Sequence, residues 1–122
     1  MFRVMLKSKI HKATVTGSDL NYEGSIAIDK ALCKKANLLE FEKVDIYNVN
    51  NGSRFSTYVI YGVKGEVTLN GAAARLVQPG DKIIIACYSM FDDAESKKHK
   101  PTVLILDAAN SVSQKFAKKK NT

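Results

Sequence analysis

Apolar and polar residues alternate along much of this chain, and the pattern predicts many short β-strands. Phe2, Val4 and Leu6 alternate with polar or outward positions, as expected of a strand. Further strands are predicted at 13–17, 25–28, 44–48, 54–61, 67–69, 82–88 and 101–106. Many short strands separated by turn signals indicate a mainly β fold, a small β-barrel.

Turn and cap residues separate these strands and predict short helices between them. Asn51-Gly52 is a strong hairpin signal between two alternating runs. Asp29 is a suitable N-cap for a short helix over 30–36. A single helical turn at 72–76 and a short helix at 92–98 are also predicted. The helices are therefore expected to be minor additions to a β structure.

Charge is distributed unevenly and suggests where the folded part ends. Residues 97–122 carry seven lysines against one acid, so most of the net charge of +7 lies at the C-terminal end. We therefore predict one domain over residues 1–107, followed by a basic, disordered tail at 108–122. Nucleic-acid binding is not expected, because it requires a basic face with aromatic or base-reading groups.

The sequence also bears on location and on the two cysteines. No stretch approaches the roughly 20 apolar residues of a membrane span, and no apolar signal region is visible. A cytoplasmic protein without membrane association is expected. Cys33 and Cys87 are then thiols, and neither belongs to a CxxC pair. We predict two core residues rather than a metal or redox site.

Gly24-Ser25 is a place where the backbone can react with its own side chain. Glycine can adopt a positive φ that exposes its carbonyl to the next residue. The Ser25 hydroxyl can then attack that carbonyl, turn the amide into an ester and, after elimination, leave a broken chain. The same pair is also a common turn dipeptide before a strand. Other parts of the sequence must decide between these interpretations.

Several distant blocks accompany this pair. Lys9 and His11 lie upstream, Arg-Phe-Ser-Thr-Tyr occupies 54–58, and Asn-Gly-Ala-Ala-Ala occupies 70–74. In order and spacing, these blocks resemble the pyruvoyl-dependent aspartate 1-decarboxylase family over about residues 1–105. The resemblance implies a double-psi β-barrel with short helices that assembles as a homotetramer.

The resemblance further implies a proenzyme that cleaves itself between Gly24 and Ser25 into a β and an α chain. Ser25 becomes a covalent pyruvoyl group, so neither a metal nor pyridoxal phosphate is expected. L-Aspartate forms a Schiff base with that group, loses CO2 and leaves as β-alanine, which feeds pantothenate and coenzyme A synthesis. Some members need a maturation helper protein, and the sequence leaves open whether this chain does.

Individual roles follow from the same resemblance. Tyr58 matches the proton donor, and a phenol is protonated at neutral pH. Arg54 and Lys9 supply cations for the two substrate carboxylates, in an order that stays open. Thr57 is assigned to substrate binding and self-processing, although strand alternation directs it away from Tyr58. A bulge or a subunit boundary would reconcile these two roles.

Small residues at 71–73 match the family's substrate-binding segment. Gly71, Ala72 and Ala73 let backbone amides approach a ligand closely, and they would equally fill a tight structural connection. Possible supporting roles are assigned to His11, Tyr22 and Asn70.

Two other functions are compatible with parts of the sequence. A non-enzymatic small basic β-barrel would bind nucleic acid or a protein partner through its tail, and that binding would be salt-sensitive. A hydrolase using Ser25 with His11 would need a G-x-S-x-G elbow and an orienting acid, neither of which the sequence shows.

Overall fold

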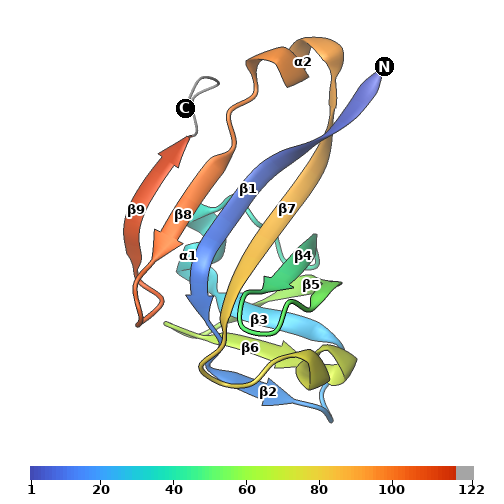
Figure 1. Ribbon diagram of the computed structural model, residues 1–122. Coiled ribbons are helices and arrows are strands. Elements are labelled where there is room, and N and C mark those ends of the chain that lie inside the picture. The colour runs from blue at the N-terminus through green and yellow to red at the C-terminus, as the bar shows by residue number, and fades with distance from the viewer. Residues whose placement is uncertain (118–122) are drawn as a thin grey trace.

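The computed structural model describes residues 1–117, in which nine strands form one mixed sheet (Figure 1). The strand order is β2-β6-β3-β5-β4-β7-β1-β8-β9. The strands are β1 (Phe2–Thr14), β2 (Gly17–Asp19), β3 (Ser25–Asp29), β4 (Lys43–Asn48), β5 (Arg54–Gly62), β6 (Val67–Asn70), β7 (Lys82–Asp92), β8 (Thr102–Leu106) and β9 (Val112–Ala117). The helical segments are α1 (Lys30–Lys35), the 3-10 helix η1 (Gly71–Leu76) and α2 (Asp93–Lys98).

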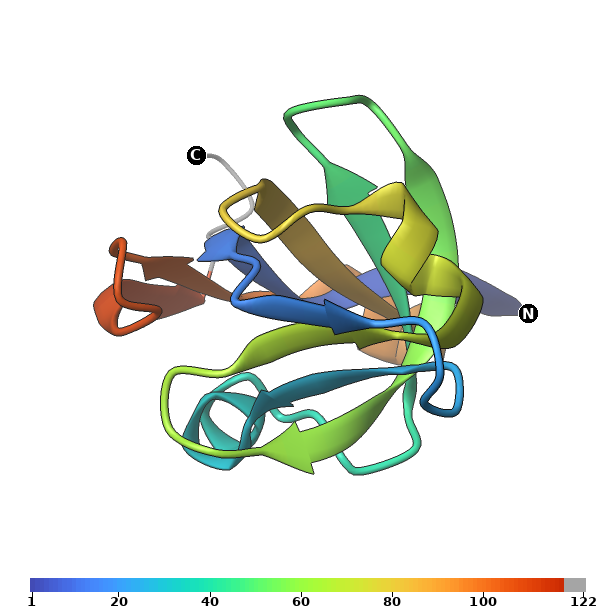
Figure 2. The same ribbon diagram turned by 90° about the horizontal axis from the view of Figure 1, so that it is seen from below.

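The fold is mainly β, as predicted, and its arrangement is consistent with the expected double-psi β-barrel. Strands β1 and β7 run side by side as the longest pair of the molecule (Figure 1). Seen from below, β2, β6 and β3 lie side by side (Figure 2). No helix among residues 1–117 has the length and apolar character needed to cross a membrane.

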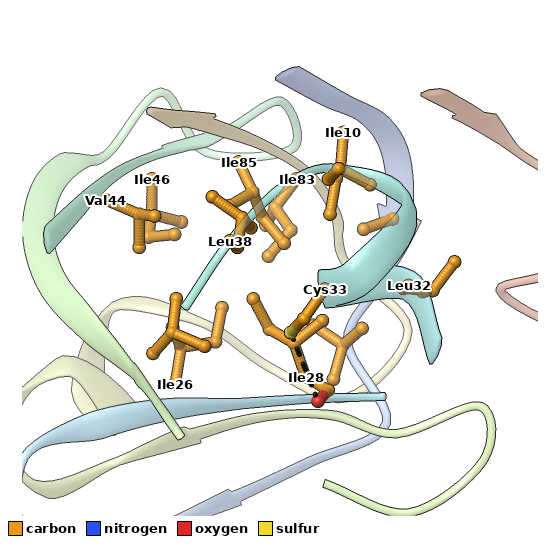
Figure 3. Packing of buried hydrophobic residues seen from close by; sticks show 14 of the residues in the cluster. Ile10, Ile26, Ile28, Leu32, Cys33, Leu38, Val44, Ile46, Ile83 and Ile85 are labelled. Carbon is orange, nitrogen blue, oxygen red and sulfur yellow. Dashed lines mark hydrogen bonds between the residues drawn. The ribbon is translucent and has the colours of Figure 1, made fainter. Parts of the chain in front are cut away.

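Branched aliphatic side chains form most of the hydrophobic core that the strands surround (Figure 3). Ile10, Ile28 and Ile46 are each at most 1% exposed, and Cys33 of α1 packs among them. The Cys33 thiol donates to the Ile28 carbonyl at 3.6 Å. Burial raises the pKa of Cys33 to about 12 and that of Cys87 to about 11. The prediction that both cysteines are core residues is confirmed.

Asp29 fixes the end of β3 through both of its carboxylate oxygens. Oδ1 accepts from the Ala31 backbone N–H at 2.8 Å, which confirms the predicted N-cap of α1. Oδ2 accepts from the Gly65 N–H at 2.8 Å. Strand β3 is thereby joined at its C-terminal end to both the following helix and the turn between β5 and β6.

Two strand predictions require correction. Residues 2–14 form one long strand with irregular register after Leu6 and after Ile10, where two separate runs were expected. Residues 112–117 form β9, although a disordered tail was predicted from residue 108. Because β9 pairs with β8 and Val112 packs against the core, the segment gains both hydrogen bonds and burial. The rest of that predicted tail, 118–122, lies outside the described residues.

Asn110 connects the turn before β9 to two other parts of the fold. Its side chain is buried, and its φ of 61° lies in the left-handed region that asparagine tolerates. Nδ2 donates to the carbonyls of Thr14 at 2.9 Å and Gly65 at 3.0 Å. Oδ1 accepts from the Thr14 N–H at 2.8 Å. All three bonds are lost if the amide is removed.

We expect Asn110→Ala to lower the free energy of unfolding by about 2–4 kcal/mol, because it removes three hydrogen bonds to partly buried backbone groups. Denaturant unfolding followed by circular dichroism measures the change. Asn21→Ala, at an exposed position, is the control and should change stability by less than about 0.5 kcal/mol. Equal effects of the two substitutions would contradict the structural role of Asn110.

Candidate active site

Ser25 is a polar residue held in a buried position at the start of β3. Its side chain is 1% exposed. The hydroxyl donates to the Glu23 carbonyl at 3.0 Å and accepts from Asn70 Nδ2 at 3.1 Å. Asn70 lies directly opposite Ser25 in the β3–β6 ladder. The two strands therefore fix the orientation of this hydroxyl next to the Gly24-Ser25 peptide bond.

Gly71 lies so close to the backbone of Gly24 that no side chain fits between them. Its φ is +69°, and a Cβ at this position would lie 2.7 Å from Gly24 Cα and 2.8 Å from Gly24 N. The positive φ expected at Gly24 occurs at Gly71 instead. Asn70 precedes η1 but makes no cap on it, since its amide donates to Ser25.

Strand register places Lys9, Arg54 and Tyr58 on one face of the sheet. Residues directly opposite each other in an antiparallel ladder share a face. A row of such positions runs from Lys9 on β1 across β7 and β4 to Ser56 on β5. Arg54 and Tyr58 lie two residues to either side of Ser56 and share its face. We call this surface the Lys9–Tyr58 face.

Ser25 belongs to the same face, at the β3 side. Ile26 pairs with Val59 in the parallel β3–β5 ladder, and both side chains are in the core. The preceding residues on each strand, Ser25 and Tyr58, therefore turn to the opposite side of the sheet. Register thus places the predicted nucleophile, the predicted proton donor and both predicted cations on the same side of the sheet, with Ser25 itself buried.

Thr57 does not join this surface. It lies opposite Val44, which is buried in the core, and the β4–β5 ladder has no register shift. A bulge therefore does not bring Thr57 and Tyr58 to the same side. The Tyr58 ring lies near Phe41, with ring centroids 6.4 Å apart.

His11, a predicted supporting residue, makes no contact with Ser25 through hydrogen bonds within residues 1–117. It pairs with Ile105 of β8. Burial, followed by the charges of Lys9 and Lys12, lowers the pKa of His11. Its Nδ1 atom is buried and, in the described part of the chain, has no hydrogen-bond partner.

Of the predicted residues in the two segments next to the Gly24-Ser25 bond, only Asn70 contacts Ser25 through its side chain. Tyr22 is exposed, and its backbone carbonyl lies near Gly71. Ala72 is exposed and Ala73 packs against the core. Asn70, expected only as a supporting residue, is the side chain that contacts Ser25.

A contact of Arg54 with Tyr47, and of Tyr47 with Tyr88, was not predicted. Arg54 Cζ lies 4.0 Å from the ring centroid of Tyr47, and the Tyr47 and Tyr88 hydroxyls are 3.0 Å apart. Tyr47 lies directly opposite Arg54 in the β4–β5 ladder. The sequence shows Tyr47 in the alternating run before the predicted hairpin. Its cross-strand partner, Arg54, could not be predicted, because the pairing depends on the length of the turn.

The arrangement combines two chemical capacities. A buried hydroxyl with an amide donor lies next to a peptide bond flanked by glycine, which suits an attack on the backbone. The guanidinium of Arg54 and the ammonium of Lys9 lie on the same face, which suits an anionic ligand.

Comparison with known proteins agrees with this chemistry. A family model described as aspartate decarboxylase matches residues 1–113. The aspartate 1-decarboxylase of Bdellovibrio bacteriovorus is 60% identical over 111 residues, which cover 91% of this chain and 90% of that protein. That of Heliobacterium modesticaldum is 57% identical over 114 residues, covering 92% and 86%. That of Syntrophus aciditrophicus is 58% identical over 114 residues, covering 92% and 98%. The chain therefore belongs to the aspartate decarboxylase family.

Proposed function

We propose that this protein cleaves its own chain at Gly24-Ser25 and then decarboxylates L-aspartate to β-alanine and CO2. The observation that carries the proposal is the buried Ser25 hydroxyl, held by Asn70 beside a peptide bond that Gly71 contacts closely. Membership in the aspartate decarboxylase family supports the substrate. The product would be consumed by a reaction that acylates its amine, as in pantothenate synthesis.

In the proposed cleavage, Ser25 Oγ attacks the Gly24 carbonyl carbon and closes a five-membered ring. Collapse of that ring breaks the C–N bond, frees the Ser25 nitrogen and leaves an ester. Loss of the Ser25 α-proton then expels Gly24 as a carboxylate, and water displaces ammonia to leave a ketone at residue 25. Asn70 contributes by holding Oγ in one rotamer through its amide.

The surroundings of Ser25 fit a pyruvoyl group. Ser25 is buried at a strand end, and Gly71 presents no side chain toward the Gly24 backbone. A pyruvoyl group there supplies a ketone and an adjacent amide carbonyl that accept the electron pair released with CO2. Burial lowers the local dielectric constant and strengthens electrostatic interactions around this position.

The Lys9–Tyr58 face would bind and protonate the substrate. Arg54 offers a planar set of N–H donors to one carboxylate, and Lys9 offers a point charge to the other. Tyr58 holds the proton that the substrate α-carbon receives.

We also propose that the active protein is a homotetramer with sites shared between subunits. The reason is the placement of Thr57 on the core side of β5, opposite Val44. In addition, no hydrogen bond within residues 1–117 joins His11 of β1 to Ser25. A neighbouring copy would complete the set of groups around each Ser25. A maturation helper protein is the second proposed partner, and adding cell extract to the uncleaved chain tests for it.

Intact-mass measurement tests the cleavage. We expect fragments 1–24 and 25–122, with the larger one reacting with phenylhydrazine because it carries a ketone. Ser25→Ala should stay whole and produce no β-alanine. Ser8→Ala, at an equally buried serine, is the matched control and should cleave normally. Production of β-alanine by a chain with an intact Ser25 would contradict the proposal.

Gly71→Ala should slow self-cleavage by about 100-fold, because the new Cβ would displace the Gly24 backbone by about 1 Å. Gly80→Ala is the matched control: Gly80 also has a positive φ, but a Cβ there meets nothing within 4 Å. Both variants lose stability from the strained φ, and only Gly71→Ala should accumulate uncleaved chain on gels. Equal cleavage rates would rule out this contact as a constraint on the reaction.

Tyr58→Phe should cleave normally and reduce kcat for aspartate by about 100-fold or more, since the proton donor is lost. Tyr61→Phe, on the opposite face of the same strand, provides the control and should retain activity. β-Alanine formation measured by amine derivatisation gives both rates. An unchanged kcat in Tyr58→Phe would show that another group delivers the proton.

A further inference from the structure

The guanidinium group of Arg54 stacks on an aromatic ring through one face, and its N–H edge has no partner in the described part of the chain. Its guanidinium carbon lies 4.0 Å from the Tyr47 ring centroid, within the range of a cation–π contact. Within residues 1–117, the Arg54 side chain forms no hydrogen bond or ion pair. Its N–H donors therefore remain available to a planar, bidentate partner such as a carboxylate.

Tyr47 is itself held by a neighbouring strand. Its hydroxyl lies 3.0 Å from that of Tyr88 on β7, so the two phenols share a hydrogen bond. This bond, followed by burial, raises the pKa of Tyr47 to about 12. The Tyr47 phenol therefore keeps its proton at neutral pH. Three adjacent strands, β5, β4 and β7, are connected in this way through Arg54, Tyr47 and Tyr88.

The connected side chains border the surface assigned to the substrate. Tyr88 lines a groove together with Asp45 and Ala86. Asp45 and Ala86 are the positions that link Lys9 to Ser56 across the Lys9–Tyr58 face. The groove therefore lies on the face that carries Lys9 and Arg54, and Tyr88, which bonds to Tyr47, forms part of its lining.

We propose that Tyr47 is a positioning residue that holds the Arg54 guanidinium with its donor edge toward the substrate carboxylate, and that Tyr88 fixes the Tyr47 ring. The inference rests on the proposed function, since it assigns Arg54 to aspartate binding. A free arginine loses rotamer freedom when it binds, and stacking removes part of that freedom beforehand. The contribution should therefore act on substrate affinity rather than on the chemical step.

The ring and the hydroxyl can be separated by substitution. Tyr47→Leu removes the stacking surface and should raise KM for aspartate about threefold to fivefold, with kcat changed less than about twofold. Tyr47→Phe and Tyr88→Phe keep both rings and lose the same hydrogen bond, so they should raise KM equally, by about 1.5-fold to twofold. Unchanged KM values in both variants would show that Tyr88 does not fix the Tyr47 ring. Tyr61→Leu, which removes the ring 5.5 Å from Lys30 Nζ, is the matched control and should leave KM unchanged.

A double-mutant cycle distinguishes positioning from a general structural effect. In the Arg54→Ala background, Tyr47→Leu should add no further loss, because the group that it positions is absent. The dissociation constant of succinate, measured by calorimetry on each variant, gives a second readout that does not depend on turnover. Succinate carries two carboxylates and no amine, so it reports the cation sites alone.

The outcomes separate the two proposals. Wild-type protein that cleaves but makes no β-alanine would refute the proposed function. Active wild-type protein in which Tyr47→Leu leaves KM and succinate affinity unchanged would refute only the role of Tyr47. If Tyr47→Leu weakened succinate binding equally with and without Arg54, the role of Tyr47 would likewise be refuted. If Tyr47→Leu fails to fold by circular dichroism, Tyr47→Met replaces it in the cycle.

Discussion

The pairing of β3 with β5 on one side and β6 on the other is the constraint on which the candidate chemistry depends. It sets Ser25 opposite Asn70 on β6. Because Ile26 pairs with Val59 on β5, it also sets Ser25 beside Tyr58, the residue before Val59. Asp29 fixes the other end of the strand. A shift of one residue in either ladder would turn Ser25 into the core and separate it from the face that carries the cations.

Local signals in the sequence were sufficient for most elements and for the family. Alternation located the strands, Asp29 located α1, and the spaced blocks identified the relatives. Register was less accessible. A two-residue turn at Asn51-Gly52 would set Arg54 opposite Val49, whereas the structure sets it opposite Tyr47. The longer turn is stabilised by Asn48, whose side chain reaches residues about thirty positions away, and no local pattern contains that information.

The contacts around the scissile bond show the same limit. The sequence directed attention to the flexibility of Gly24, but the close approach comes from Gly71, far along the chain. Asn70 had only a supporting assignment because its contact with Ser25 exists only once β3 and β6 pair. Residue identity therefore indicated the chemistry, while the tertiary arrangement determined which side chains take part in it.

A cut ahead of Ser25 has a consequence for the integrity of the molecule. The short product would consist of β1 and β2, and β1 occupies an interior place in the sheet between β7 and β8. Ile10, Ala13 and Val15 of that product are buried in the common core. The mature protomer would thus be a heterodimer of two peptides without a covalent link. Its small peptide could leave only by opening the sheet through the middle, so scission and permanent association are compatible.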